Sequence, residues 1–119
     1  ASETLASGQA LGIAPEGTRS KNAQLQRGKP GTIMLAMKSG VPIVPVGITG
    51  TEDALKKLSH LRRPHIFVRF GEPIILPTFE PGHRSEELKR WTEILMQRIA
   101  ELLPESYRGV YAEAVENEK

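Results

Sequence analysis

The sequence predicts an α/β fold, with alternating strands and helices that form part of a mostly parallel sheet with flanking helices, truncated at the N-terminus. Helical and strand patterns alternate along the 119 residues. Such alternation is typical of parallel strands joined by right-handed crossovers. No internal repeat or linker divides the chain, and its length suits one small domain. Leu5 to Gly8 look like the last turn of a helix whose start is missing, so we expect the chain to begin within a larger domain.

The first predicted strand is "QALGIA", residues 9–14, which follows the helix-stopping Gly8. Residues 15–30 contain Pro, Gly, Ser, Asn and four cations, so they form a long loop. A loop of this length inside a compact domain is often functional.

A helix and a strand are predicted on either side of Gly40. "GTIMLAMKSG", residues 31–40, predicts a helix for which the last glycine is a natural stop. Its apolar face consists of Ile33, Met34 and Met37. In the following "VPIVPVGIT", proline lacks a ladder donor, so Pro42 should precede the strand and Pro45 should lie near its beginning.

Two short elements come next. Thr51 is predicted to cap a short helix that carries Glu52 and Asp53 in its first turn and Leu55 and Leu58 as its apolar stripe. The alternation in "HIFVRF", residues 65–70, predicts a strand.

A long amphipathic helix closes the domain. Ser85 is expected to cap it and Pro104 to end it. Apolar residues recur in it at intervals of three and four. They are Leu88, Trp91, Leu95, Ile99 and Leu102. We therefore assign residues 1–112 to the C-terminal part of one domain and residues 113–119 to a flexible polar tail.

Positive charge is concentrated in one segment, although the net charge of the chain is only +2. Residues 16–29 carry +3, because one anion, Glu16, accompanies Arg19, Lys21, Arg27 and Lys29. Such focusing suits a small anionic ligand or an anionic surface, and a solvated basic loop is the alternative. The net charge is too small to indicate nucleic acid, and no apolar run is long enough to cross a bilayer.

"PEGTRS", residues 15–20, has the composition of a phosphate site. Gly17 lets backbone N–H groups approach an anion, the Thr18 hydroxyl can donate, and the planar fork of Arg19 matches phosphate oxygens. Glu16 would orient Arg19 or accept from a substrate hydroxyl. The alternative is a β-turn with an exposed arginine.

Other sites find no support in the sequence. Neither a P-loop nor G-x-G-x-x-G nor G-x-S-x-G is present, so no cofactor is expected. Cysteine is absent, and His60, His65 and His83 show no H-x-x-x-H spacing, so we expect surface histidines and no metal.

Two blocks carry a resemblance to a known family. "PEGTRS" followed by "GVPIVPVGITG", residues 40–50, resembles the glycerolipid acyltransferases, most closely the 1-acylglycerol-3-phosphate (lysophosphatidate) type. "VRFGEPI" (68–74) and "LLPESYRGVYA" (102–112) are similar to bacterial members. The resemblance runs from about Leu5 to Ala112. It departs from the family pattern at Ala14, where a bulky residue is usual.

The resemblance implies transfer of an acyl group from acyl-CoA or acyl-carrier protein to the free hydroxyl of a lysophosphatidate, giving phosphatidate. Glu16, Gly17, Thr18 and Arg19 would bind the acceptor phosphate and glycerol, with Ser20 as a further candidate. Separately from the resemblance, the focusing of charge suggests that Lys21, Arg27 and Lys29 add charge there. Residues 41–46 would support the site. The family base, the histidine of an H-x-x-x-x-D block, cannot be drawn in this sequence, whose one aspartate is Asp53.

We therefore expect an acceptor-binding half without catalytic residues, inactive as an isolated chain. The whole protein would act at the cytoplasmic face of the membrane, and the fragment would be soluble. An acyltransferase for another acceptor, such as glycerol 3-phosphate or another lysolipid, and a non-catalytic module for anionic headgroups remain open. A truncated sheet would expose an edge and apolar surface, so self-association is also expected.

Overall fold

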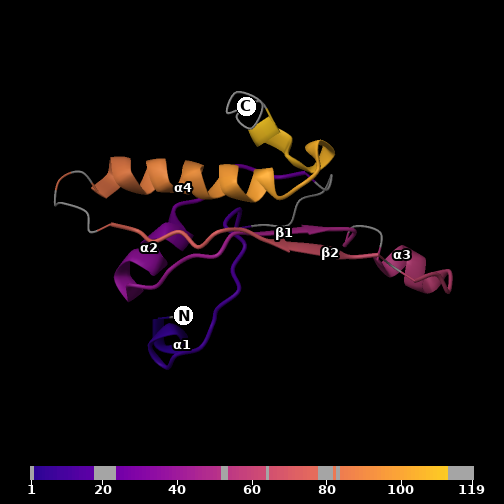
Figure 1. Cartoon of the computed structure of the whole chain (residues 1–119), viewed down its shortest axis with the longest axis horizontal. Coiled ribbons are helices and arrows are strands. Elements are labelled where there is room, and N and C mark those ends of the chain that lie inside the picture. The colour runs from indigo at the N-terminus through magenta and orange to yellow at the C-terminus, as the bar shows by residue number, and fades with distance from the viewer. Residues whose placement is uncertain are drawn as a thin grey trace.

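The structure is a computed structural model that describes residues 2–17, 24–51, 54–63, 65–77, 82 and 84–112. Its elements follow one another in the order α1, α2, β1, α3, β2, α4 and two short 3₁₀ turns, η1 and η2 (Figure 1). Their bounds are Ser2–Ala6, Gly31–Ser39, Val46–Thr49, Ala54–Ser59, Phe67–Phe70, Arg84–Glu101, Glu105–Tyr107 and Gly109–Tyr111. The predicted tail, residues 113–119, lies outside the described residues.

The described sheet has two strands, and they are antiparallel. β1 pairs with β2 from Val46 opposite Phe70 to Thr49 opposite Phe67, and a bridge between Ile43 and Ile74 prolongs the pairing. The expected parallel pairing is wrong for these strands. Two neighbouring strands can be parallel only if the segment between them, usually a helix, crosses over one face of the sheet. Here α3 lies beyond the strand ends, so the chain simply turns back (Figure 1).

The strand predicted over residues 9–14 is not formed. This segment has no ladder partner among the described residues. Leu11 and Ile13 are 37% and 51% exposed, so the apolar run is not buried either. An apolar composition favours a strand but does not make one, because the backbone groups also need a neighbouring strand.

Helix α2 confirms the predicted helix and its stop at Gly40. It ends at Gly40, whose φ of 65° lies in the left-handed region and whose N–H donates to the Ala36 carbonyl at 2.9 Å. This is the conformation that glycine adopts without a Cβ penalty. The buried face is shifted from the predicted one, because Ile33 is buried together with Thr32 and Ala36, whereas the two predicted methionines are half-buried.

Helix α4 provides most of the core. Its Leu95, Met96, Ile99 and Ala100 are buried and pack with Ile33 of α2. Ser85 does not cap this helix, because α4 already begins at Arg84.

The C-terminal end of α4 is held by Arg108. Its Nε donates to the Ala100 and Leu103 carbonyls, each at 3.1 Å. A cation in this place satisfies free carbonyls and complements the helix dipole.

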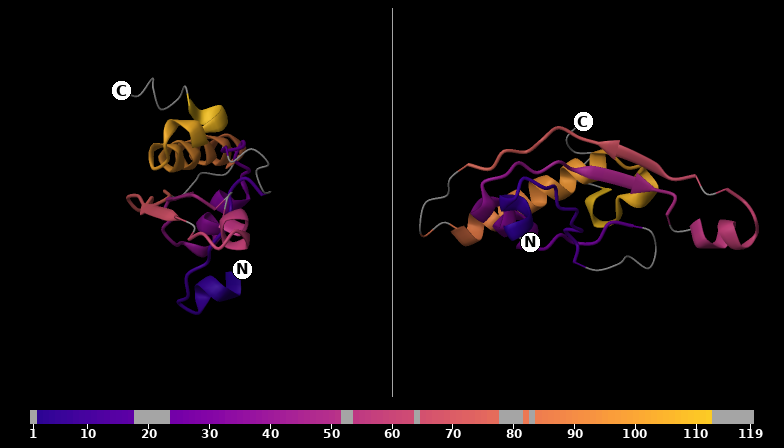
Figure 2. Two further views of the ribbon diagram at one scale, coloured as in Figure 1. Left: turned by 90° about the vertical axis from the view of Figure 1, so that its right-hand side faces the viewer. Right: turned by 90° about the horizontal axis from the view of Figure 1, so that it is seen from below.

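The elements lie at three levels. The sheet and α2 lie between α4 and α1, and α3 projects from one end (Figure 2). The radius of gyration is 15.8 Å, whereas a compact chain of this length has about 13.5 Å. The expected apolar exposure is present, since Ile48, Val68 and Phe70 of the sheet are 47–72% exposed. Self-association through it stays a prediction.

Leu58, the described member of the stripe expected on the short helix, is not buried. α3 begins at Ala54, after Thr51, and Leu58 is 56% exposed. Glu52, Asp53 and the side chain of Leu55 lie outside what the structure describes.

Candidate functional site

The segment "APEG" forms a β-turn. The Gly17 N–H donates to the Ala14 carbonyl at 3.0 Å, which closes four residues with Pro15 in the second place and Gly17 in the fourth. These are the positions that proline and glycine favour in the commonest turn. Gly17 has a φ of 72°, a conformation that an L side chain rarely adopts. The sequence therefore produces the turn locally, whatever binds to it.

A second segment, residues 24–30, fastens this turn from the side. The Lys29 N–H donates to the Pro15 carbonyl at 2.8 Å, and the Gln26 N–H donates to Oε2 of Glu16, also at 2.8 Å. Glu16 thus joins the two ends of the loop. This is a structural role that the sequence does not indicate, because it depends on a residue ten positions away. A hydrogen bond to a carboxylate contributes about 1.5–3 kcal/mol.

The side chain of Lys29 lies over Gly17. A Cβ added to Gly17 would lie 3.0 Å from Cδ of Lys29 and 3.3 Å from its Nζ. The absence of a side chain therefore lets an ammonium group approach the turn backbone. The structure brings together Glu16, Gly17 and Lys29, and of these Lys29 was indicated only by its place in the basic segment.

Residues 24–30 pack on the C-terminal part of the chain. The Leu25 N–H donates to the Tyr107 carbonyl at 2.8 Å, and the Gly28 N–H donates to the Tyr111 hydroxyl at 2.9 Å. Gly28 also packs on α4, where an added Cβ would lie 2.5 Å from Cγ of Met96. The position of Lys29 is thus set by residues more than sixty positions away in the sequence.

Tyr111 lies in the core, where its hydroxyl accepts the Gly28 N–H. Its ring is buried, and this burial raises the pKa of the phenol above its usual value of 10.0. The charge of Glu93 also raises this pKa, whereas the hydrogen bond from Gly28 and the charge of Arg27 lower it. Burial is the largest cause, because the phenolate would lose its hydration.

Tyr111→Phe is expected to lower the free energy of unfolding by about 1–2 kcal/mol at neutral pH, because the Gly28 N–H loses its acceptor. The pH dependence should change as well. A raised native pKa means that folding favours the protonated phenol, so this contribution is complete below pH 10 and is lost as the pH rises through the native value. Urea unfolding across this range checks both effects. An alkaline loss as steep in Tyr111→Phe as in the parent would contradict this role.

Three of the predicted binding residues, Thr18, Arg19 and Ser20, lie outside the described residues, as does Lys21. Their roles stay predictions. In the predicted supporting block, residues 41–46, Ile43 pairs with Ile74, and the Pro45 carbonyl accepts from the Gly71 N–H at 2.9 Å. The Val41 N–H donates to the Ala36 carbonyl of α2 at 3.3 Å.

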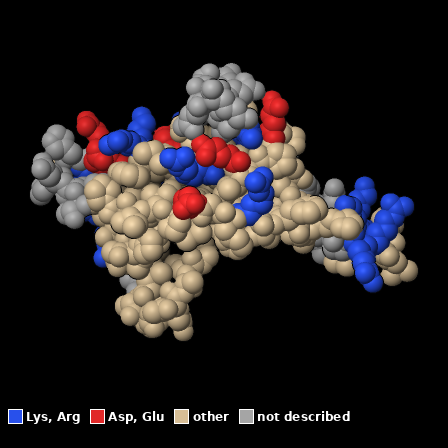
Figure 3. Space-filling view, viewed as in Figure 1, with Lys and Arg blue, Asp and Glu red and all other residues tan. Residues whose placement is uncertain are grey.

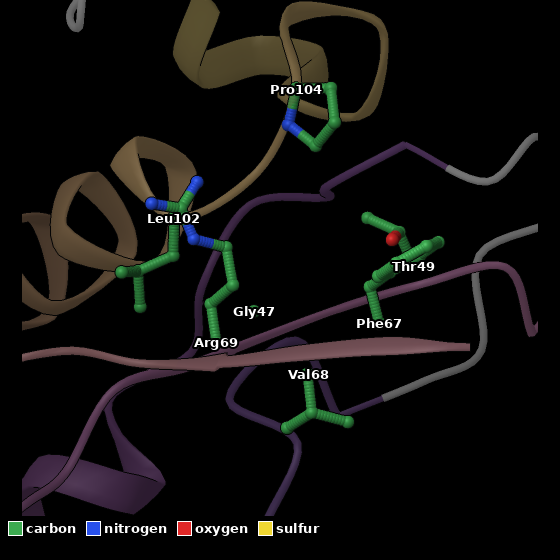
Figure 4. Close-up of a pocket in the computed structure, with 7 residues that line it drawn as sticks. All are labelled: Gly47, Thr49, Phe67, Val68, Arg69, Leu102 and Pro104. Carbon is green, nitrogen blue, oxygen red and sulfur yellow. The ribbon is translucent and has the colours of Figure 1, made fainter. Parts of the chain in front are cut away.

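A hollow of about 270 Å³ lies between the sheet and the end of α4 (Figure 4). Arg69 points from β2 toward Leu102, and Val68 points to the opposite face of the sheet (Figure 4). The lining residues are Gly47, Thr49, Phe67, Val68, Arg69, Leu102 and Pro104. Arg69 is the one titratable side chain among them, so the hollow has no acid–base pair.

Histidines and metal ligands show no catalytic grouping within the described part of the chain. His60 and His65 are exposed around the projecting end, and His83 is not described. No group of three His, Cys, Asp or Glu residues that could hold a metal is found among the described residues. None of the described helices is both long and apolar enough to span a bilayer.

The comparison with known proteins gives one family. Residues 1–49 match the family model described as Acyltransferase. The chain is 37% identical over 97 residues to a 1-acyl-sn-glycerol-3-phosphate acyltransferase of Cocos nucifera, which covers 81% of this chain and 30% of the relative. It is 33% identical over 88 residues to the Escherichia coli protein of the same name, 74% of this chain and 36% of the relative.

A third relative covers almost the entire chain. A 1-acyl-sn-glycerol-3-phosphate acyltransferase of Chlamydomonas reinhardtii is 27% identical over 119 residues, 98% of this chain and 33% of the relative. The chain thus spans about a third of the length of the curated relatives it matches. No solved structure matches.

Proposed function

We propose that this chain, which belongs to the acyltransferase family and is of the 1-acyl-sn-glycerol-3-phosphate acyltransferase type, provides the acceptor-phosphate-binding part of such an enzyme. Residues 1–112 are its part of the acyltransferase domain. The acceptor is a 1-acylglycerol 3-phosphate, the donor is acyl-CoA or acyl-carrier protein, and the product is phosphatidate.

One observation carries this proposal: the fastened turn at Pro15–Gly17 with the ammonium group of Lys29 over it. A turn with a left-handed glycine can direct backbone N–H groups at an anion. Lys29 and the adjoining Arg27 supply positive charge at its side. Arg19, two residues further along the sequence, would add a bidentate donor to the same anion.

Glu16 has a separate task in this proposal. A carboxylate would repel a phosphate, but Oε2 of Glu16 accepts the Gln26 N–H. Its charge is thereby directed at the loop backbone, which reduces its repulsion of the ligand.

The chemistry itself requires a base for the attacking hydroxyl. Deprotonation of an alcohol that attacks a thioester needs an acceptor within hydrogen-bond reach. The 119 residues contain no H-x-x-x-x-D block. The described histidines lie on the projecting end, away from the turn (Figure 1). This chain can therefore hold an acceptor but not activate it.

The 119-residue chain is expected to transfer no acyl group to 1-acylglycerol 3-phosphate, whereas a longer chain that includes an H-x-x-x-x-D block is expected to be active. Product formation from radiolabelled acyl-CoA checks this, with a longer chain carrying His→Ala in that block as the control. Equal activity of the short and long chains would contradict the proposal.

A binding module for anionic headgroups is the second candidate, favoured by the same turn and by the absent base. Titration of the longer chain with glycerol 3-phosphate and with lysophosphatidate separates the two candidates. Binding without any turnover in the presence of donor would favour the module. Turnover with glycerol 3-phosphate or a different lysolipid in preference to lysophosphatidate would instead indicate another acceptor.

A further inference from the structure

The end of the molecule that projects beyond the sheet is both cationic and apolar. This segment, residues 54–66, comprises α3 and the chain leading into β2, and is called the arm below. It carries Lys56, Lys57, Arg62 and Arg63 and no acidic residue. The acidic residues nearest before it in the sequence are Glu52 and Asp53, which are not described. Figure 3 shows its cations as a separate blue group at the same end as α3 in Figure 1.

These cations have no described counter-ion. The ion pairs found among the described residues lie on α4, between Arg90 and Glu87 and between Arg98 and Glu101. On the arm, Lys56, Arg62 and Arg63 are exposed and Lys57 is half-buried. A group of cations on a projecting element attracts an anionic surface.

Exposed apolar side chains lie among these cations. Leu61 is 97% exposed, Leu58 is 56% exposed and Ile66 is 49% exposed. Single exposed leucines are common, but three apolar side chains on so short a projection form a patch.

The backbone at Leu61 makes its exposure more unusual. The Arg62 N–H donates to the Lys57 carbonyl at 2.7 Å and the Leu61 N–H to the Leu58 carbonyl at 3.1 Å, a helix end that usually has glycine at the left-handed position. Leu61 occupies this position with a φ of 58°. A leucine there is strained and gains no burial within the described chain, so the fold gives no reason for it.

We propose that the arm docks on the surface of an anionic lipid bilayer, with Leu58 and Leu61 entering the headgroup region and the four cations contacting lipid phosphates. This combination is the one that surface-bound helices use, an apolar side inserted and Lys or Arg at the phosphates. Nucleic acid would attract the same cations but offers no apolar phase for Leu61. The inference does not depend on the proposed acceptor site, which lies on a different segment.

The test is sedimentation of the 119-residue chain with vesicles. Binding is expected with phosphatidylcholine mixed with phosphatidylglycerol, and much weaker binding with phosphatidylcholine alone or at high salt. Arg62→Gln with Arg63→Gln should weaken binding to the mixed vesicles roughly thirtyfold, because each cation near such a surface contributes about fivefold. The matched control, Lys38→Gln with Lys89→Gln on α2 and α4, should leave it unchanged.

Leu61→Gly tests insertion separately from folding. Glycine suits the left-handed position, so thermal unfolding should occur at the same temperature or higher. Binding to the mixed vesicles should nevertheless fall about five- to tenfold, because the inserted side chain is gone.

Three results would overturn the proposal: no binding to the mixed vesicles, vesicle binding that neither arm variant changes, or tighter binding to duplex DNA that competes with the vesicles. The first result leaves the acceptor-site proposal intact, and loss of acceptor binding in a longer chain leaves this one intact.

Discussion

Gly28→Ala is expected to lower the free energy of unfolding by about 2–3 kcal/mol, because the added methyl group overpacks the contact between residues 24–30 and α4. A Cβ at this position would lie 2.5 Å from Cγ and 2.8 Å from Sδ of Met96, and 3.1 Å from Cγ2 of Thr92. Met96 is fully buried in the core, so it has no free space into which it can turn. Either α4 or the basic segment must therefore shift.

The shift would also strain the hydrogen bond that holds residues 24–30 against Tyr111. The Gly28 N–H donates to the Tyr111 hydroxyl, and Lys29 follows directly. Urea unfolding of the variant measures the loss. Gly12→Ala is the matched control, because nothing lies within 4 Å of its added Cβ and its φ is ordinary, so its stability should be unchanged. Equal stabilities of the two variants would show that residues 24–30 do not pack on α4 as described.

Arg19→Ala, made in a longer and active chain, is expected to raise the KM for the acceptor roughly ten- to hundredfold. A guanidinium that holds a phosphate makes charge-assisted hydrogen bonds of about 1.5–3 kcal/mol each. The KM for the acyl donor should be unchanged, because Arg19 is proposed to contact the acceptor alone. Steady-state kinetics with each substrate varied in turn measures both values.

Arg19→Lys separates bidentate recognition from simple charge. It should recover only part of the loss, since an ammonium group cannot form two parallel bonds. Lys38→Ala, which removes an exposed cation in the last turn of α2, is the control and should change neither KM. An unchanged acceptor KM in Arg19→Ala would reject the phosphate-binding role.

Local signals in the sequence predicted the helices well. Gly40 ends α2 because the left-handed conformation is intrinsic to glycine, and Pro45 immediately precedes β1 because it has no N–H for a ladder. With Ser85 as its cap, α4 was expected to begin at Glu86, two residues after its actual start at Arg84. Its predicted apolar face is present, with Leu95 and Ile99 buried.

Errors arose where distant segments had to meet. The parallel pairing of β1 with β2 was wrong, and the strand over residues 9–14 is absent among the described residues, because pairing depends on where the connecting segment lies in space. The same limit applied to the candidate site. The sequence indicated Gly17 and Glu16 as candidate site residues, but it could not indicate that Lys29 lies over Gly17.

The sequence by itself determined the family resemblance, the glycine–proline turn, the end of α2 at Gly40 and the absence of a histidine–aspartate block, since each depends on residues close together in the chain. Only the tertiary structure decided the direction of the strands, the hydrogen bond from Gly28 to Tyr111 and the exposure of Leu61 on the arm. Gly28 and Tyr111 are 83 positions apart. Contacts of this kind depend on how whole elements pack around α4, so no local pattern of residues predicts them.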